Sequence, residues 1–203
     1  LQITLFEEKT VRAQSHDGLK LSEEVRQKLL ELQQKGIDVN EQLQTSNKHI
    51  FAAGDVLGRD SYTHSAVLES RIAANNILSK TKVAPDYTGT PGIIFTYPAI
   101  AHVGLSEDDC NKRGVSISKA LAPLNMVARS NTSDFRDGFV KIIADKKGTI
   151  LGATIVAPHA AEMIHELSLA IKHNLTADDV AQTPHAFLSW SEAVRVAAGK
   201  LVK

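Results

Sequence analysis

The sequence predicts an α+β chain, in which an antiparallel sheet is flanked by helices and follows a smaller region of different composition. Three observations predict this arrangement. Short apolar segments typical of strands cluster between residues 93 and 157. Segments with helical periodicity flank the grouped strands. A stretch at residues 80–91 contains two prolines and a glycine, which favours a boundary between two domains, residues 1–84 and 85–203.

The first 37 residues contain two predicted elements. Residues 3–6 are apolar and have the pattern of a strand. Ser22 is placed to cap a helix that ends near Gly36, because apolar residues recur on one face between these two positions.

A short apolar segment, residues 49–53, is predicted as a strand that ends at Gly54 and then presents Asp55. Glycine lets the backbone approach a ligand closely, and a carboxylate accepts hydrogen bonds from hydroxyl groups. A Gly-Asp pair is equally compatible with a plain turn. The next predicted helix begins at Tyr62, Thr63 and His64, and its N-terminus can stabilise negative charge.

The larger region has a regular order of predicted elements. The expected strands cover residues 93–96, 101–105, 138–144 and 149–157, and residues 145–148 have the composition of a hairpin turn. Ser106 and Thr176 each precede an aspartate by three residues, a spacing that predicts a capped helix start. A further helix is predicted between Ala161 and Asn174.

Composition and charge exclude several classes of function. The 23 basic and 23 acidic residues cancel, so no overall field favours nucleic acid or a membrane surface. No apolar run approaches the roughly 18 residues that a membrane span needs. No signal-like segment opens the chain, so we expect a cytoplasmic protein.

The single cysteine excludes a redox pair within the chain, and the spacing of His159 and His165 does not favour a metal site. Cys110 is the sole cysteine, which excludes an internal disulfide and a CxxC or CxxxxC pair within this chain. His159 and His165 lie six positions apart, a spacing that does not place two ligands on one helical face. We therefore predict no metal site.

Seven segments between residues 92 and 198 occur in a specific order: FTYP, IAHVGLSE, GFVKIIAD, ILGATIVAP, AAEMIHELSLAI, LTADDVAQT and HAFLSWSEAV. Their order resembles the interface, or dimerisation, domain of the FAD-dependent pyridine nucleotide-disulfide oxidoreductases. This is the family of dihydrolipoamide dehydrogenase, glutathione reductase and mercuric reductase. Residues 37–56 resemble the segment that returns the family's chain to its FAD domain.

The resemblance implies an enzyme of redox homeostasis that uses FAD and NAD(P)H and works as a homodimer. Its substrate would be a small molecule or small thiol, with a disulfide or a soft metal ion as acceptor. The chain has no GxGxxG turn, no ATGR-like segment and no cysteine pair. We therefore interpret it as a C-terminal part, with residues 1–84 as a partial FAD/NAD(P)-binding region and residues 85–203 as the dimerisation domain. In that part, the flavin contacts implied by the resemblance are Gly54, Asp55, Tyr62, Thr63 and His64.

Phe187 marks a departure from the family pattern. Most members carry an acid/base histidine five residues before the glutamate that aligns with Glu192, and here that position is Phe187. The mercuric reductase branch also has an aromatic residue other than histidine there, so the chain is similar to that branch. His185 aligns with a histidine that is usually not catalytic, and it is retained as a second candidate for proton transfer. Glu192 can then bond the backbone or hold His185.

Two further alternatives follow from the missing proton carrier. The chain can belong to a non-catalytic dimerisation module, or to a truncated inactive paralogue. Trp190 and Phe187 can form an apolar wall at the site, or can simply pack in an interface.

Overall fold

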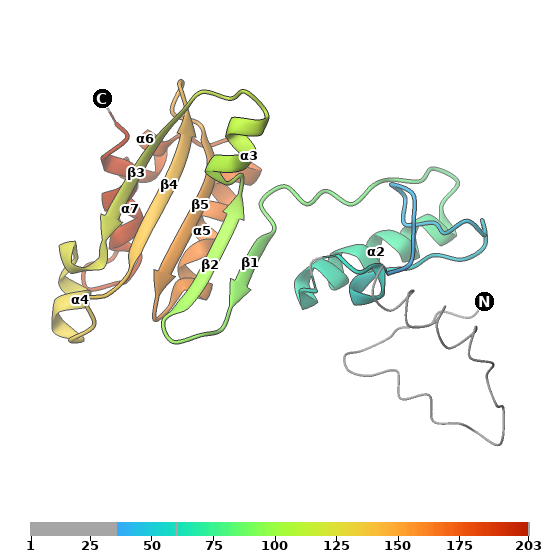
Figure 1. Cartoon of the computed structure of the whole chain (residues 1–203), viewed down its shortest axis with the longest axis horizontal. Coiled ribbons are helices and arrows are strands. Elements are labelled where there is room, and N and C mark those ends of the chain that lie inside the picture. Colours follow the sequence, from blue (N-terminus) through green and yellow to red (C-terminus); the bar gives the residue numbers. More distant parts are fainter. Residues whose placement is uncertain (1–35, 60, 203) are drawn as a thin grey trace, which may run out of the picture. The chain divides into compact units, whose positions relative to one another are not determined.

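A computed structural model describes residues 36–59 and 61–202 (Figure 1). The strand predicted at residues 3–6 and most of the helix predicted from Ser22 lie outside these ranges. The chain divides into two compact units, Leu1–Tyr87 and Thr88–Lys203.

The described part of the first unit is built around one long helix. α2 covers Thr63–Leu78, and a short 3-10 helix, η1, covers Gly54–Leu57. A small core forms around Leu43, Leu57 and Ala73. The fully buried Asn76 ties α2 to the chain on both sides, because its amide donates to the carbonyls of Gln42 at 3.0 Å and Val83 at 2.8 Å.

The strand predicted at residues 49–53 is wrong. Phe51 forms an isolated antiparallel bridge with Gln44, and no ladder extends from it. The intervening chain folds back at once, because Ile50 N–H donates to Asn47 O at 2.9 Å and Thr45 N–H donates to Ile50 O at 3.0 Å. On the side away from this turn the pairing stops at Leu43, whose φ of 65° is not that of an extended strand.

The second unit contains a five-stranded antiparallel sheet with the order β1-β2-β5-β4-β3. The strands are β1 (Pro91–Ile94), β2 (Ala99–Gly104), β3 (Ile117–Pro123), β4 (Phe139–Asp145) and β5 (Ile150–Ala157). The four predicted strands are confirmed, with bounds shifted by a few residues. β3 was not predicted, because it is an edge strand and its N-terminal half, with Ser118 and Lys119, is polar.

The helices of the second unit are α3 (Glu107–Lys112), α4 (Ala128–Thr132), α5 (Ala160–Lys172), α6 (Ala177–Gln182) and α7 (Glu192–Gly199), with a 3-10 turn η2 (Leu124–Met126). The capping boxes predicted at Ser106 and Thr176 are confirmed at α3 and α6. The predictions did not include α4, η2 and α7, which are all short. Asn174 follows α5 with φ 54°, close to the predicted helix end.

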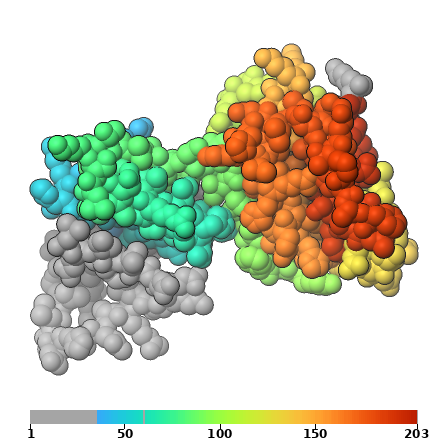
Figure 2. Space-filling view, turned by 180° about the vertical axis from the view of Figure 1, so that it is seen from behind, coloured from blue at the N-terminus to red at the C-terminus, as the bar shows by residue number. Residues whose placement is uncertain are grey.

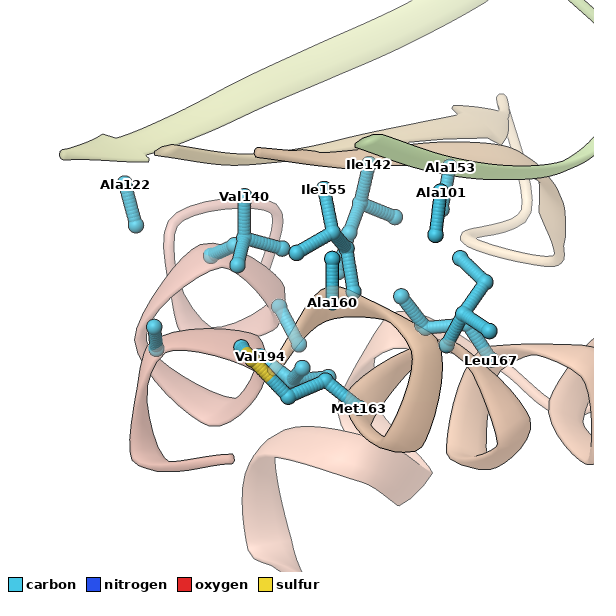
Figure 3. Close-up of a cluster of buried hydrophobic side chains, with 14 of the residues drawn as sticks. Ala101, Ala122, Val140, Ile142, Ala153, Ile155, Ala160, Met163, Leu167 and Val194 are labelled. Carbon is cyan, nitrogen blue, oxygen red and sulfur yellow. The ribbon is translucent and has the colours of Figure 1, made fainter. Parts of the chain in front are cut away.

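The core lies between one face of the sheet and the C-terminal helices (Figure 3). Ala101, Val140 and Ile155 point from the strands toward Leu167 of α5 and Val194 of α7 (Figure 3). Seen from behind, the orange and red C-terminal segments cover the sheet (Figure 2). Burial of this face supplies the main hydrophobic stabilisation of the unit.

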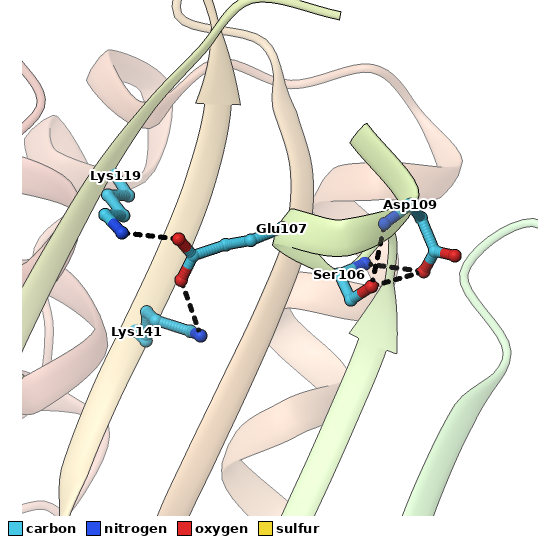
Figure 4. A network of polar contacts seen from close by, with 5 residues as sticks. All are labelled: Ser106, Glu107, Asp109, Lys119 and Lys141. Atoms are coloured by element: carbon cyan, nitrogen blue, oxygen red, sulfur yellow. Dashed lines mark hydrogen bonds and ion pairs between the residues drawn. The ribbon is translucent and has the colours of Figure 1, made fainter. Parts of the chain in front are cut away.

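The opposite face of the sheet carries polar contacts at the end where α3 lies (Figure 4). Glu107 of α3 forms ion pairs with Lys119 of β3 and, at 3.0 Å, with Lys141 of β4. These lysines hold the pKa of Glu107 below its usual value. The three side chains are partly exposed, so the pairs fix the position of α3 more than they add stability.

Candidate functional site

The Gly54–Asp55 turn is held by a buried carboxylate. Gly54 has φ 79°, and its N–H donates to Glu69 Oε2 at 2.6 Å. Glu69 lies on α2 and is 4% exposed, and its other oxygen accepts a hydrogen bond from the Tyr87 hydroxyl at 2.6 Å. Two donors therefore stabilise a charge that would be costly to bury alone.

Tyr87 remains a donor to this carboxylate over a wide pH range. Burial, and then the hydrogen bond and charge of Glu69, raise the pKa of Tyr87 to about 12. Arg59 Nη1 lies 3.5 Å from the same hydroxyl and opposes the shift. The phenol therefore stays protonated at neutral pH, and the Gly54–Glu69–Tyr87 chain of hydrogen bonds persists.

The turn lies against the start of α2. A Cβ added at Gly54 would come within 3.0 Å of Ala66 Cβ, in the first turn of the helix. At the other end of the turn, the Asp55 side chain is exposed. The structure therefore brings a close-approach glycine and an exposed carboxylate to the N-terminal end of α2.

The N-terminus of α2 begins without a side-chain cap from Tyr62. Tyr62 occupies the capping position without a side-chain cap, and the first turn contains no acidic residue. Thr63 and His64 are exposed, and the His64 ring stacks on Tyr62 with centroids 5.3 Å apart. Of the five residues predicted to contact flavin, Gly54 and Asp55 lie in η1, Thr63 and His64 begin α2, and Tyr62 is the N-cap of α2.

This set of groups fits a flavin nucleotide. The Asp55 carboxylate can accept hydrogen bonds from sugar-like hydroxyls, and the amides that begin α2 can face an anionic ring edge. Gly54 without a Cβ keeps the turn close to the helix.

The second predicted site lies in the loop between α6 and α7, residues 183–191. Phe187 is 76% exposed and carries no group that can transfer a proton. Glu192 begins α7, and its Oε2 accepts from the backbone N–H of Leu188 at 3.1 Å, where φ is 62°. Of the two roles left open for Glu192, the structure shows the bond to backbone.

The partner of His185 is Glu166, and not Glu192 as the sequence had left open. Its Nε2 lies 2.7 Å from Glu166 Oε1 on α5, and its Nδ1 lies 2.7 Å from the Thr183 carbonyl oxygen. Burial raises the pKa of Glu166, and the charge and hydrogen bond of His185 oppose that rise. The partners are 19 positions apart on different elements, so no spacing rule predicts their contact.

Trp190 and Phe187 lie in different environments. Trp190 is 9% exposed, belongs to the core, and meets Phe135 edge-to-face at 6.2 Å. Its Nε1 is buried and has no hydrogen-bond partner among the described residues. Phe187 is on the surface, whereas Trp190 packs in the core.

The described residues give two further observations. Within residues 36–59 and 61–202, no group of three or more His, Cys, Asp or Glu side chains is arranged to hold a metal ion. No helix in these ranges has the length and apolar character that crossing a bilayer requires.

Comparison with known proteins shows the family. Residues 90–198 match the pyridine nucleotide-disulphide oxidoreductase dimerisation domain, and residues 15–76 match the pyridine nucleotide-disulphide oxidoreductase domain. The chain belongs to the pyridine nucleotide-disulphide oxidoreductases. The resemblance inferred from the seven ordered segments is thereby confirmed.

Individual members of the family align with most of the chain. Dihydrolipoyl dehydrogenase 2, mitochondrial, of Arabidopsis thaliana is 37% identical over 79% of the chain and 32% of its own length. Mercuric reductase of Staphylococcus aureus is 34% identical over 78% of the chain and 29% of its own length. The chain therefore spans about a third of the length of the curated relatives that it matches.

The fold also matches a solved structure of the family. The crystal structure of LpdA from Mycobacterium tuberculosis matches with a TM-score of 0.75 and 30% sequence identity. The match covers 83% of this chain and 37% of the LpdA chain. The five-stranded antiparallel sheet with flanking helices is therefore the fold of the family's dimerisation region.

Proposed function

We propose that this chain is the C-terminal part of an FAD-dependent oxidoreductase that uses NAD(P)H. In this proposal residues 1–84 contribute to the flavin side of the protein, and residues 85–203 form the homodimer interface. The family assignment supports both roles, since the two matched regions are an oxidoreductase domain and a dimerisation domain.

The observation that carries the flavin assignment is the Gly54 turn fixed by the buried Glu69. This bond sets the turn next to the first turn of α2, where Gly54 lies against Ala66. Asp55 would bind flavin-nucleotide hydroxyls, and the first turn of α2, from Thr63, would face the ring system with Tyr62 and His64 beside it. FAD, when bound, supplies the acceptor for a hydride from the nicotinamide.

The proposed acceptor is a disulfide, a small thiol couple or a soft metal ion. Dihydrolipoyl dehydrogenases and a mercuric reductase are among the relatives. Phe187 favours the acceptors that need no proton relay, because the residue at the usual acid/base position cannot donate a proton. Glu192, which in most of the family orients that histidine, would here position the loop through Leu188.

A second candidate function is a non-catalytic dimerisation module or inactive paralogue. The same residue favours it, because an exposed phenylalanine at the acid/base position is compatible with lost catalysis. Flavin binding separates the two candidates, since a module of this kind has no need of the Gly54–Asp55 turn.

The experiment is FAD binding by the full protein that contains this chain. Asp55→Ala should lose FAD, because a ligand hydroxyl loses its acceptor at a cost of about 1–3 kcal/mol. The matched control is Asp38→Ala, which removes another exposed aspartate of the same unit. Flavin absorbance after gel filtration gives the occupancy. Equal occupancy in the parent and Asp55→Ala would remove Asp55 from the cofactor site, and a protein that never takes up FAD would favour the module.

A further inference from the structure

The His185 ring is held between two oxygen atoms. Nδ1 lies 2.7 Å from the carbonyl oxygen of Thr183, and Nε2 lies 2.7 Å from Glu166 Oε1. The His185 side chain is 6% exposed, so water does not compete strongly for either nitrogen. A carbonyl oxygen accepts hydrogen bonds and never donates them, so Nδ1 must carry a proton.

The contact with Glu166 requires a second proton. With Nδ1 protonated, a neutral ring leaves a lone pair on Nε2, and a carboxylate has only lone pairs to offer. A separation of 2.7 Å between these atoms is a hydrogen bond only if one proton lies between them. The pair is therefore either an imidazolium with a carboxylate or a neutral imidazole with a carboxylic acid.

Loss of the shared proton breaks one of the two contacts. If Nδ1 keeps its proton, lone pairs on Nε2 and Oε1 face each other. If the remaining proton moves to Nε2, the lone pair on Nδ1 faces the Thr183 carbonyl. Neither tautomer satisfies both oxygen atoms, so the loop cannot stay bound at both points without the shared proton.

We propose that His185 and Glu166 are positioning residues, whose shared proton holds the loop 183–191 against α5 and so sets the place of Phe187 and Glu192. The two ends of the loop are fixed locally: Thr183 Oγ1 donates to Asp179 O at 2.8 Å, and Glu192 accepts from Leu188 N–H. His185 adds the tie to α5. Its effect on catalysis rests on the proposed function, whereas the hydrogen bond between His185 and Glu166 does not.

Other titratable groups on the flanking helices have partners or exposure of their own. Asp178 accepts from Gln182 at 2.6 Å, Asp179 closes the capping box with Thr176, and Glu162 lies 3.9 Å from His159 Nδ1. The side chains not in these contacts are His165, Lys172, Glu192 and Arg195, of which His165, Lys172 and Arg195 are exposed and Glu192 bonds Leu188.

The direction of the pH effect follows from the proton count. At low pH a further proton on Glu166 leaves the imidazolium N–H donating to a carboxyl oxygen, so the tie survives. As the pH rises and the shared proton leaves, the tie is lost. The loop should therefore loosen on the alkaline side, and not on the acid side.

Trp190 provides the readout, since it is the sole tryptophan and lies in the same loop, just before Ser191, the N-cap of α7. The tryptophan fluorescence of the full 203-residue chain is recorded as the pH is raised from neutral to alkaline values. The parent should show an alkaline transition. His185→Ala should show, at all pH values, the emission that the parent shows once the loop has been released at alkaline pH. Glu166→Gln should keep the neutral-pH emission of the parent at all pH values, because the glutamine amide N–H can donate to Nε2 of the neutral His185 ring.

Two control variants separate this signal from others. Glu162→Gln removes a carboxylate from the same helix with a side chain that is 73% exposed, and it should keep the parent transition. His159→Gln tests the ring that lies 6.2 Å from Trp190, because a nearby imidazole can change the emission directly. An alkaline transition that persists in Glu166→Gln, or is missing from the parent, overturns the proposal.

A measurement on the parent alone keeps the inference testable if a variant fails to fold. Nitrogen-15 NMR of the histidine rings should show His185 Nδ1 protonated at neutral pH. An unprotonated Nδ1 would contradict the proposal. Neither measurement needs flavin, so they stand or fall independently of the proposed oxidoreductase activity. In a flavin-bound protein the same alkaline transition should appear in the pH profile of turnover and disappear in Glu166→Gln.

Discussion

Removing the carboxylate of Glu69 should weaken flavin binding without any direct contact to the ligand. Glu69→Ala deletes the acceptor of the Gly54 N–H, which lies 2.6 Å away, and the 4% exposure of Glu69 leaves little water to replace it. A hydrogen bond to a buried charged group contributes about 1.5–3 kcal/mol. If this free energy orders the turn that presents Asp55, FAD affinity should fall by about 10- to 150-fold.

Graded variants test whether the bond to Gly54 is the cause. Glu69→Gln keeps an acceptor oxygen for Gly54 and offers an N–H to the Tyr87 hydroxyl, so its loss should be less than about tenfold. Tyr87→Phe removes the second donor but leaves the bond to Gly54. Glu41→Ala is the control for loss of an exposed glutamate in the same unit.

The assay is titration of the flavin-free protein with FAD, followed by flavin fluorescence, with circular dichroism to verify the fold. The expected order of affinity is parent and Glu41→Ala, then Glu69→Gln, then Glu69→Ala. Parent-like affinity in a folded Glu69→Ala protein would refute the reasoning, because the turn would then hold its shape without the buried bond.

Two other predictions concern Phe187 and the core. Phe187→His restores a proton carrier and should raise turnover of disulfide substrates by up to about 10²–10⁴-fold, measured by steady-state kinetics of the flavin-bound protein; a parent that already reduces disulfides at ordinary rates, unaffected by Phe187→Ala, would contradict it. Leu167→Ala should lower the free energy of unfolding by about 2–5 kcal/mol, because Leu167 is fully buried. Leu169→Ala on the same helix, where the side chain is 59% exposed, should change it by about 0.5 kcal/mol or less. Equal losses in the two leucine variants by urea denaturation would show that burial does not set the difference.

Local patterns in the sequence determined most of the second unit. Short apolar segments on either side of a turn-like stretch predicted the strands at residues 138–144 and 149–157, and the Ser106 and Thr176 spacings predicted two helix starts. These features depend on neighbours within about four positions along the chain, so the sequence carries them directly. The seven ordered segments identified the family for the same reason, since each is a continuous run of residues.

Tertiary structure decided the elements whose local pattern is weak. β3 exists because residues 117–123 pair with β4 along their whole length, although Ser118 and Lys119 are polar. The segment at residues 49–53 has a strand-like composition but finds a partner only at Phe51, so it forms a bridge instead of a strand.

The contacts that set the candidate sites also came from the tertiary structure. Glu69 reaches Gly54 across 15 positions, and Glu166 reaches His185 across 19. Glu69 lies outside the seven ordered segments and Glu166 lies inside one of them, but no local spacing indicates either contact. The sequence by itself was enough to single out Asp55, His185 and Phe187 as candidate site residues. Only the packed chain decided that Glu166 holds His185 and that the buried Glu69 holds Gly54 beside Asp55, because these partners come from segments that are distant in sequence.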